Sequence, residues 1–95
     1  MALCTVVATV TGASHNAEVT INGEDVNMSA AGGDQWSGAL VVDLPPAGQA
    51  PLLVAVVGVA TTWGVSITFT PPRANPNPYT KQNLSKKSPQ LLDLV

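Results

Sequence analysis

Residues 17–30 read AEVTINGEDVNMSA, and this stretch decides the fold. Apolar residues occupy every second position from 17 to 21, and Asn22-Gly23 follows them directly. This residue pair tolerates the positive φ angles that both central positions of a type I′ turn require. Beyond the turn, apolar residues return at positions 26, 28 and 30. The pattern predicts a β-hairpin with one apolar face.

The same period of two recurs on both sides of this hairpin. From Cys4 to Thr11, apolar residues at even positions alternate with Thr or Val at odd positions, and further alternating segments start at Trp36 and at Trp63. The stretch from Leu52 to Val59 is apolar on both faces, which is unusual where one face of each strand meets water. Turn residues separate the segments, and none of them has a helical period. We expect an all-β fold, a small antiparallel β-sandwich of about six strands.

The charges divide the chain into an acidic body and a basic tail. Residues 1–72 hold five acids and no Lys or Arg, whereas residues 73–95 hold all four of these cations and one acid. Four of the eight prolines lie between positions 71 and 78. Because proline favours extended backbone, we expect a β-sandwich domain over residues 1–71 and an extended basic C-terminal arm over residues 72–95. Such a charge asymmetry is typical of an interacting arm.

Two short motifs resemble bacterial immunoglobulin-like modules. The hairpin from Asn16 to Gly23 is similar to one that these modules carry, and residues 33–40, GDQWSGAL, resemble the strand entry whose Trp packs in their core. Here the order before Trp36 is Gly33-Asp34-Gln35, where the family has Asp-Gly. The resemblance covers residues 12–70. It implies a non-catalytic β-sandwich building block of the kind found in adhesins, surface proteins and phage virion proteins, and it assigns no site.

The inventory of reactive side chains argues against catalysis. The chain has one His and one Cys, and neither a nucleophile elbow, a metal-ligand pair nor a phosphate loop is present in the sequence. We interpret His15 as a surface loop residue and Cys4 as a buried strand thiol. Glu24-Asp25 could help to hold Ca²⁺, but adjacent strand side chains point to opposite faces, so solvated turn charges are the preferred interpretation. We expect no enzyme, no cofactor and no bound metal.

Trp36 and Trp63 allow two interpretations. Together they could form a sugar-stacking platform, which would make the chain a carbohydrate-binding module. Each of them, however, begins an alternating apolar series, and an aromatic residue in that position more often lies in the core. We favour the core for both residues and keep carbohydrate as the alternative partner.

Partners and location follow from the same composition. No apolar run is long enough for a membrane helix, and the start MALCT lacks the basic region of a signal peptide. We therefore expect a protein made in the cytoplasm without a signal peptide and with no membrane partner. Four cations with one aromatic residue are too sparse a set for a nucleic-acid site.

The surplus apolar face of residues 52–59 and the basic tail together suggest assembly with other proteins. We interpret the chain as a small β-sandwich subunit that binds other protein copies through a sheet face and its C-terminal arm. In its most concrete form it is a virion accessory or capsid decoration protein, and a carbohydrate-binding or adhesive module is the alternative. The predicted partner-binding residues are Leu53, Val57, Arg73, Tyr79, Lys81, Lys86, Lys87, Leu91, Leu92 and Leu94.

Overall fold

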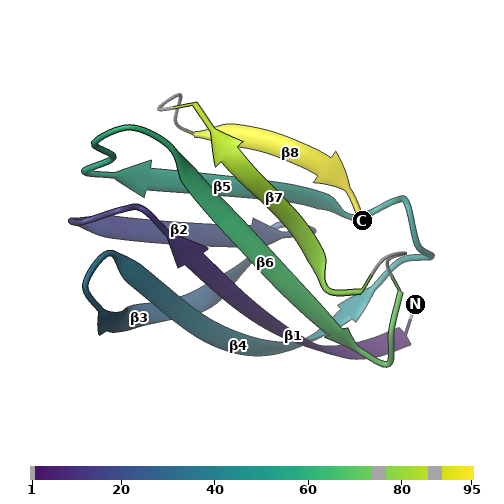
Figure 1. Cartoon of the computed structure of the whole chain (residues 1–95). Helices are drawn as coiled ribbons and strands as arrows, with labels where there is room; N and C mark the ends of the chain where they lie inside the picture. The colour runs from purple at the N-terminus through teal and green to yellow at the C-terminus, as the bar shows by residue number, and fades with distance from the viewer. Residues whose placement is uncertain (1, 74–76, 86–88) are drawn as a thin grey trace.

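The computed structural model describes residues 2–73, 77–85 and 89–95. These residues form eight strands and no helix. The strands are β1 (Ala2–Thr11), β2 (Asn16–Ile21), β3 (Glu24–Gly32), β4 (Gln35–Leu44), β5 (Pro51–Val57), β6 (Trp63–Thr70), β7 (Tyr79–Leu84) and β8 (Gln90–Leu94). All neighbours are antiparallel, and they form one curled sheet in the order β7-β6-β1-β4-β3-β2-β5-β8 (Figure 1).

The all-β, antiparallel class that the sequence predicts is confirmed, but the expected six-strand sandwich is replaced by eight strands in one curled sheet. The β2–β3 hairpin accounts for the continuity. Its strand β3 pairs with β4 and its strand β2 pairs with β5, so the hairpin links the two halves of the sheet. Without the hairpin, β4 and β5 would lie at the edges of two separate sheets.

The Asn22-Gly23 turn has the predicted geometry. Both residues have positive φ, 51° at Asn22 and 82° at Gly23, and Ile21 pairs with Glu24 across the two-residue loop. A type I′ turn twists in the same sense as its flanking strands, which explains why this loop can close the hairpin so tightly.

The core is the inner, concave side of the sheet. Alternate residues of six strands are buried there, among them Val6 and Val10 of β1, Val19 of β2, and Ile67 and Phe69 of β6. Burying each such side chain stabilises the fold by about 1.5–3 kcal/mol relative to exposing it. The ambiguous stretch after residue 51 is also resolved, because Leu52, Val54 and Val56 face inward and the residues between them face outward.

The described residues of the expected C-terminal arm form two further strands. Strand β6 ends at Thr70, before Pro71-Pro72, but the chain then turns back and β7 pairs with β6. Asn77 fixes this return: its side-chain Oδ1 accepts from the Phe69 N–H at 3.0 Å, and its Nδ2 donates to the Phe69 carbonyl at 3.3 Å. The Asn77 side chain thus makes the two hydrogen bonds that a residue of a paired strand would make through its backbone. The prolines therefore do not keep this segment extended as an arm, and β7 returns antiparallel to β6.

Strands β7 and β8 occupy the two opposite edges of the sheet, which the curl brings close together. The Tyr79 hydroxyl on β7 lies 3.4 Å from Oδ2 of Asp93 on β8. The Trp63 indole N–H donates to the Ser85 carbonyl at 2.6 Å, just beyond β7. The C-terminal segment therefore closes over the open side of the curled sheet.

Candidate protein-binding surface

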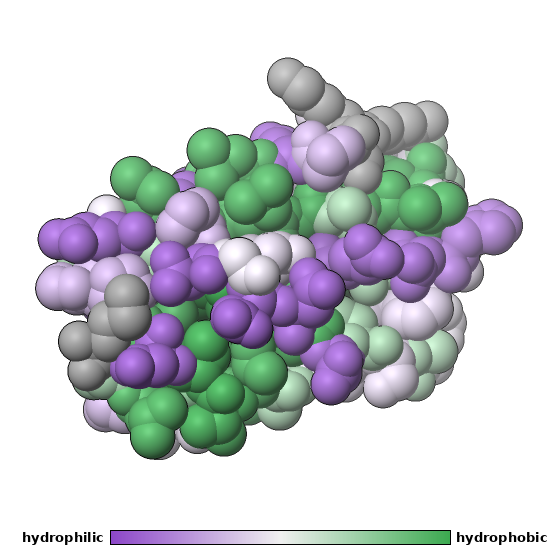
Figure 2. Space-filling model, turned by 180° about the vertical axis from the view of Figure 1, so that it is seen from behind, coloured by the Kyte–Doolittle hydropathy of each residue, from purple (hydrophilic) through white to green (hydrophobic). Residues whose placement is uncertain are grey.

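The outer face of β5 and β8 carries a cluster of exposed apolar side chains. Leu53 and Leu91 are direct cross-strand partners, and they are 38% and 60% exposed. Val57 on β5 and Leu94 on β8 extend the cluster, at 54% and 53%. We call Leu53, Val57, Leu91 and Leu94 the β5–β8 patch. It contributes to the apolar (green) surface along the upper part of the molecule in Figure 2.

The local sequence explains why this patch remains outside. The inward residues of β5 already fill the core, so its outward residues have no place there. On β8, a register shift leaves Leu92 as an extra residue between the partners of Leu52 and Leu53. Leu92 consequently packs against the core while Leu91 stays outside. Exposed apolar side chains that share one sheet face make this surface a candidate for protein binding.

A second apolar cluster was missed by the sequence reasoning. Leu3 and Val7 of β1 and Val41 of β4 are 70%, 44% and 64% exposed. Val41 pairs with Thr5, so Leu3 and Val7 are its diagonal neighbours on the same outer face. We call these three residues the β1–β4 patch. The available signal was that Leu3 and Val7 interrupt the Thr residues of the outward positions in the first strand.

A polar band (purple) crosses the surface between the green areas above and below it in Figure 2. Strands β2 and β3 lie between β5 and β4 in the sheet and supply the exposed acids Glu18, Glu24 and Asp25. The two patches are therefore separate surfaces.

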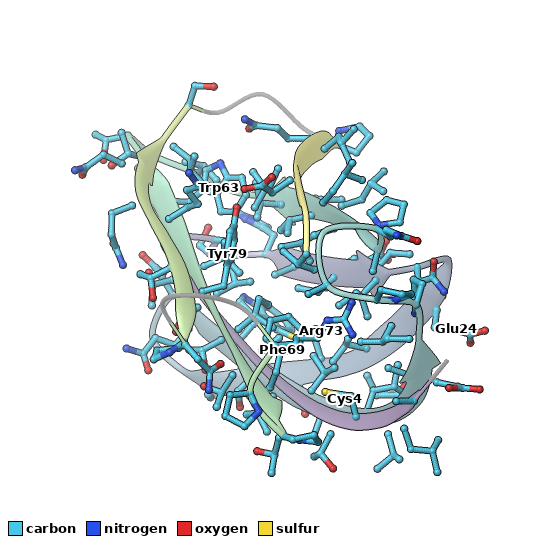
Figure 3. The ribbon with its side chains drawn as sticks, turned by 90° about the vertical axis from the view of Figure 1, so that its right-hand side faces the viewer. Cys4, Glu24, Trp63, Phe69, Arg73 and Tyr79 are labelled. Carbon is cyan, nitrogen blue, oxygen red and sulfur yellow. The ribbon has the colours of Figure 1, made fainter. Side chains whose placement is uncertain are left out.

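The structure separates the predicted cationic residues. Arg73 is half-buried and faces its own chain, since its guanidinium donates to the main-chain oxygens of Pro45 at 2.6 Å and Val95 at 2.9 Å. It also lies 5.9 Å from the centre of the Phe69 ring, and the two side chains lie close together in Figure 3. Lys81 is exposed on β7, 5.8 Å from the Tyr79 ring. Lys86 and Lys87 lie outside the described residues. The hydrogen bonds of Arg73 are thus made within its own chain.

Tyr79 also has an internal role. Its partial burial, together with the charge of Asp93 and their hydrogen bond, raises the pKa of its hydroxyl to about 12. Burial is the largest of these causes, and it acts by disfavouring the charged phenolate.

Of the ten predicted partner-binding residues, the structure places Leu53, Val57, Leu91 and Leu94 on one outer face.

The structure gives no support to a sugar platform at Trp63. This residue is 2% exposed and its indole N–H is bonded within the chain, which confirms the core interpretation. Trp36 is partly buried against the core, and its N–H donates to the Ala13 carbonyl at 2.7 Å. The two rings therefore do not form an open platform.

The reactive residues are dispersed. Cys4 is a buried free thiol, as predicted, and His15 is exposed with its Nδ1 2.9 Å from the Ser14 hydroxyl. Glu24 points away from the body in Figure 3, and Asp25 accepts from the Thr20 hydroxyl at 3.0 Å. Within the described residues, no three His, Cys, Asp or Glu side chains gather as metal ligands.

Comparisons with known proteins give no relative. No family model, no curated protein and no solved structure matches the chain. In the part of the chain that the structure describes, no helix is both long and apolar enough to cross a membrane.

Proposed function

We propose that this protein is a non-catalytic assembly subunit that binds further copies of itself through the β5–β8 patch. The observation that carries the proposal is the cross-strand pair Leu53–Leu91, exposed on the outer face, with Leu94 opposite Pro51 and Val57 four residues further along β5. Covering four such side chains removes apolar area from water, which favours association by about 25 cal/mol for each Å² buried. The proposed interface is a sheet face, and no catalytic side chain is required.

The most concrete form of this proposal is a virion accessory or capsid decoration protein. A repetitive protein surface would supply many equivalent contacts for one small β subunit. Two exposed apolar patches, separated by a polar band, support this form, because one patch can hold a neighbouring copy while the other meets the underlying surface. The carbohydrate-binding alternative has no comparable support, since both indole N–H groups are bonded inside the chain.

The test replaces apolar side chains by polar ones of smaller size. A Leu53→Ser/Leu91→Ser variant should remain folded, because both side chains are outside the core, and should lose self-association in sedimentation velocity at 1 M salt. The matched control is Leu3→Ser/Val41→Ser, which makes the same type of change on the β1–β4 patch. We expect the control to associate as the unmodified chain does. If only the control variant dissociates, the interface is assigned to the wrong patch.

A further inference from the structure

The pairing of β2 with β3 stops after three residue pairs, from Ile21 and Glu24 at the turn to Val19 and Val26. Beyond these, β2 continues back to Asn16 and β3 continues to Gly32, and the two strands diverge (Figure 1). A pocket of about 260 Å³ occupies the fork. We call this pocket, lined by residues 16–19 and 25–28, the β2–β3 notch.

The notch leaves one backbone edge of β3 open. In a hairpin closed by two residues, the flanking pair exchanges hydrogen bonds and every second residue faces the partner strand. By this alternation the backbone N–H and C=O groups of Val26 point toward β2, and those of Asn27 and Ser29 point toward β4. Those of Met28 and Ala30 point to the side on which β2 has diverged, although both residues are also in register with β4. Exposed strand edges are usually protected by charges or proline. Residues 27–30, NMSA, contain neither.

The charge around the notch favours a cationic strand. Glu18 and Asp25 are among the lining residues, both are exposed, and no cation lines the notch. The other edge of the same half of the sheet is β7, which pairs only with β6. Strand β7 carries Lys81, which has no acidic partner among the described residues. The molecule therefore presents an acidic notch beside β3 and, on β7, an edge that carries Lys81 and has no backbone partner beyond β6, although the Tyr79–Asp93 contact links it to β8.

We propose that the open edge of β3 in one copy pairs with the free edge of β7 in a second copy. The inference rests on the proposed self-association but assigns it a second joint, distinct from the β5–β8 patch. A two-fold joint of β3 with β3 would bring the acids of two notches together, and β7 with β7 would do the same for two Lys81 side chains. Like charges placed opposite each other destabilise strand pairs, whereas the β3–β7 joint combines opposite charges.

The proposed joint is head-to-tail. Strands β7 and β3 are separated by four antiparallel steps through β6, β1 and β4, so they run in the same direction. A second copy with the same face outward therefore adds its β7 as a parallel strand beside β3. Because the two surfaces differ, each copy keeps one edge free, and the joint extends to a row or a closed ring of copies.

A mixing experiment tests this geometry. Both variants carry Leu53→Ser/Leu91→Ser, so that the β5–β8 patch does not contribute. One also carries Glu18→Lys, which reverses charge at the notch, and the other carries Lys81→Glu, which reverses charge on β7. We expect each variant alone to be monomeric at low salt. Their mixture should form a 1:1 complex, because the first retains a normal β7 and the second a normal notch. Asp43→Lys, an exposed acid on β4, replaces Glu18→Lys as the control and should leave association intact.

The outcomes separate this inference from the proposed function. A 1:1 complex that disappears in 0.5–1 M salt (a Debye length of about 3–4 Å) supports the joint. If the mixture and the Leu53→Ser/Leu91→Ser parent are both monomeric at low salt, the β3–β7 joint is overturned. The interface at the β5–β8 patch is unaffected by that result. Equal association of the Glu18→Lys and Asp43→Lys variants also overturns it, since the notch charge then plays no part.

Discussion

Trp63 joins the core to the C-terminal segment. Its ring is buried at the start of β6, and its N–H donates to the Ser85 carbonyl at 2.6 Å. We expect Trp63→Ala to lower the free energy of unfolding by about 3–5 kcal/mol, the usual effect of deleting a core aromatic side chain. Urea unfolding monitored by the fluorescence of Trp36 measures this change.

A conservative replacement separates packing from hydrogen bonding at the same position. Trp63→Phe keeps most of the apolar ring but removes the N–H, so it leaves the Ser85 carbonyl without this donor. The expected loss is smaller than for Trp63→Ala because a large apolar ring remains. A Trp63→Ala variant as stable as the unmodified chain would show that the ring does not belong to the core.

Tyr79 gives the fold an alkaline limit. Its folded pKa of about 12 lies above its ordinary value of 10.0, so folding favours the protonated hydroxyl. The resulting stabilisation is fully present below pH 10 and is lost as the pH rises toward 12. We expect the stability of the unmodified chain to fall over this interval more steeply than that of Tyr79→Phe.

The Asp93 contribution can be measured separately. Absorbance of the phenolate gives the pKa of Tyr79 directly. Asp93→Asn should lower this pKa only in part, because burial, the largest cause, remains after the charge is removed. A Tyr79 that titrates near 10 in the unmodified chain would contradict the contact across β7 and β8.

At the scale of elements, β7 depends on one side chain for its return. Asn77 makes both hydrogen bonds that join the start of β7 to Phe69. We expect Asn77→Ala to reduce hydrogen-exchange protection in residues 79–84 while β1 and β4 keep theirs. Thr80→Ala, an exposed change on β7 itself, serves as the control. Equal protection of β7 in Asn77→Ala and the control would remove Asn77 from this role.

The first six strands could be predicted because their information is local. Alternation starting at Cys4 or Trp63 shows which residues face inward, and Asn22-Gly23 specifies its own turn. Strands β7 and β8 could not be predicted in this way. The sequence of β7, YTKQNL, has no apolar alternation, so it becomes a strand only through pairing with β6 and the Asn77 bonds. The prolines between positions 71 and 78 and the lysines after them indicated an extended arm instead.

The candidate surface was predictable in part for a similar reason. A strand that is apolar on both faces must leave one of them outside the core. Leu53 and Val57 share one of these faces, and both were predicted from the sequence as the exposed residues. Arg73 could not be placed correctly, because its partners at Pro45 and Val95 are distant in sequence. The β1–β4 patch depends on the register of two strands that are also far apart along the chain.

At the scale of the whole molecule, the body is elongated, with extents of 37 × 22 × 21 Å. The apolar patch and the charged groups invoked in the two proposals lie on different strands. The β5–β8 patch is apolar, whereas the β2–β3 notch and Lys81 carry opposite charges. Salt therefore separates their contributions. Charge pairs on the surface are screened within about 8–10 Å at physiological ionic strength, but apolar contacts are not.

The central claim, self-association through the β5–β8 patch, is tested most directly by the molar mass in solution. Light scattering coupled to size exclusion should give a mass for the unmodified chain that exceeds the 9.7 kDa of one copy and rises with protein concentration. At 1 M salt that association should persist in the unmodified chain and be absent from Leu53→Ser/Leu91→Ser. A constant mass of 9.7 kDa for the unmodified chain at every concentration and salt level would contradict the account.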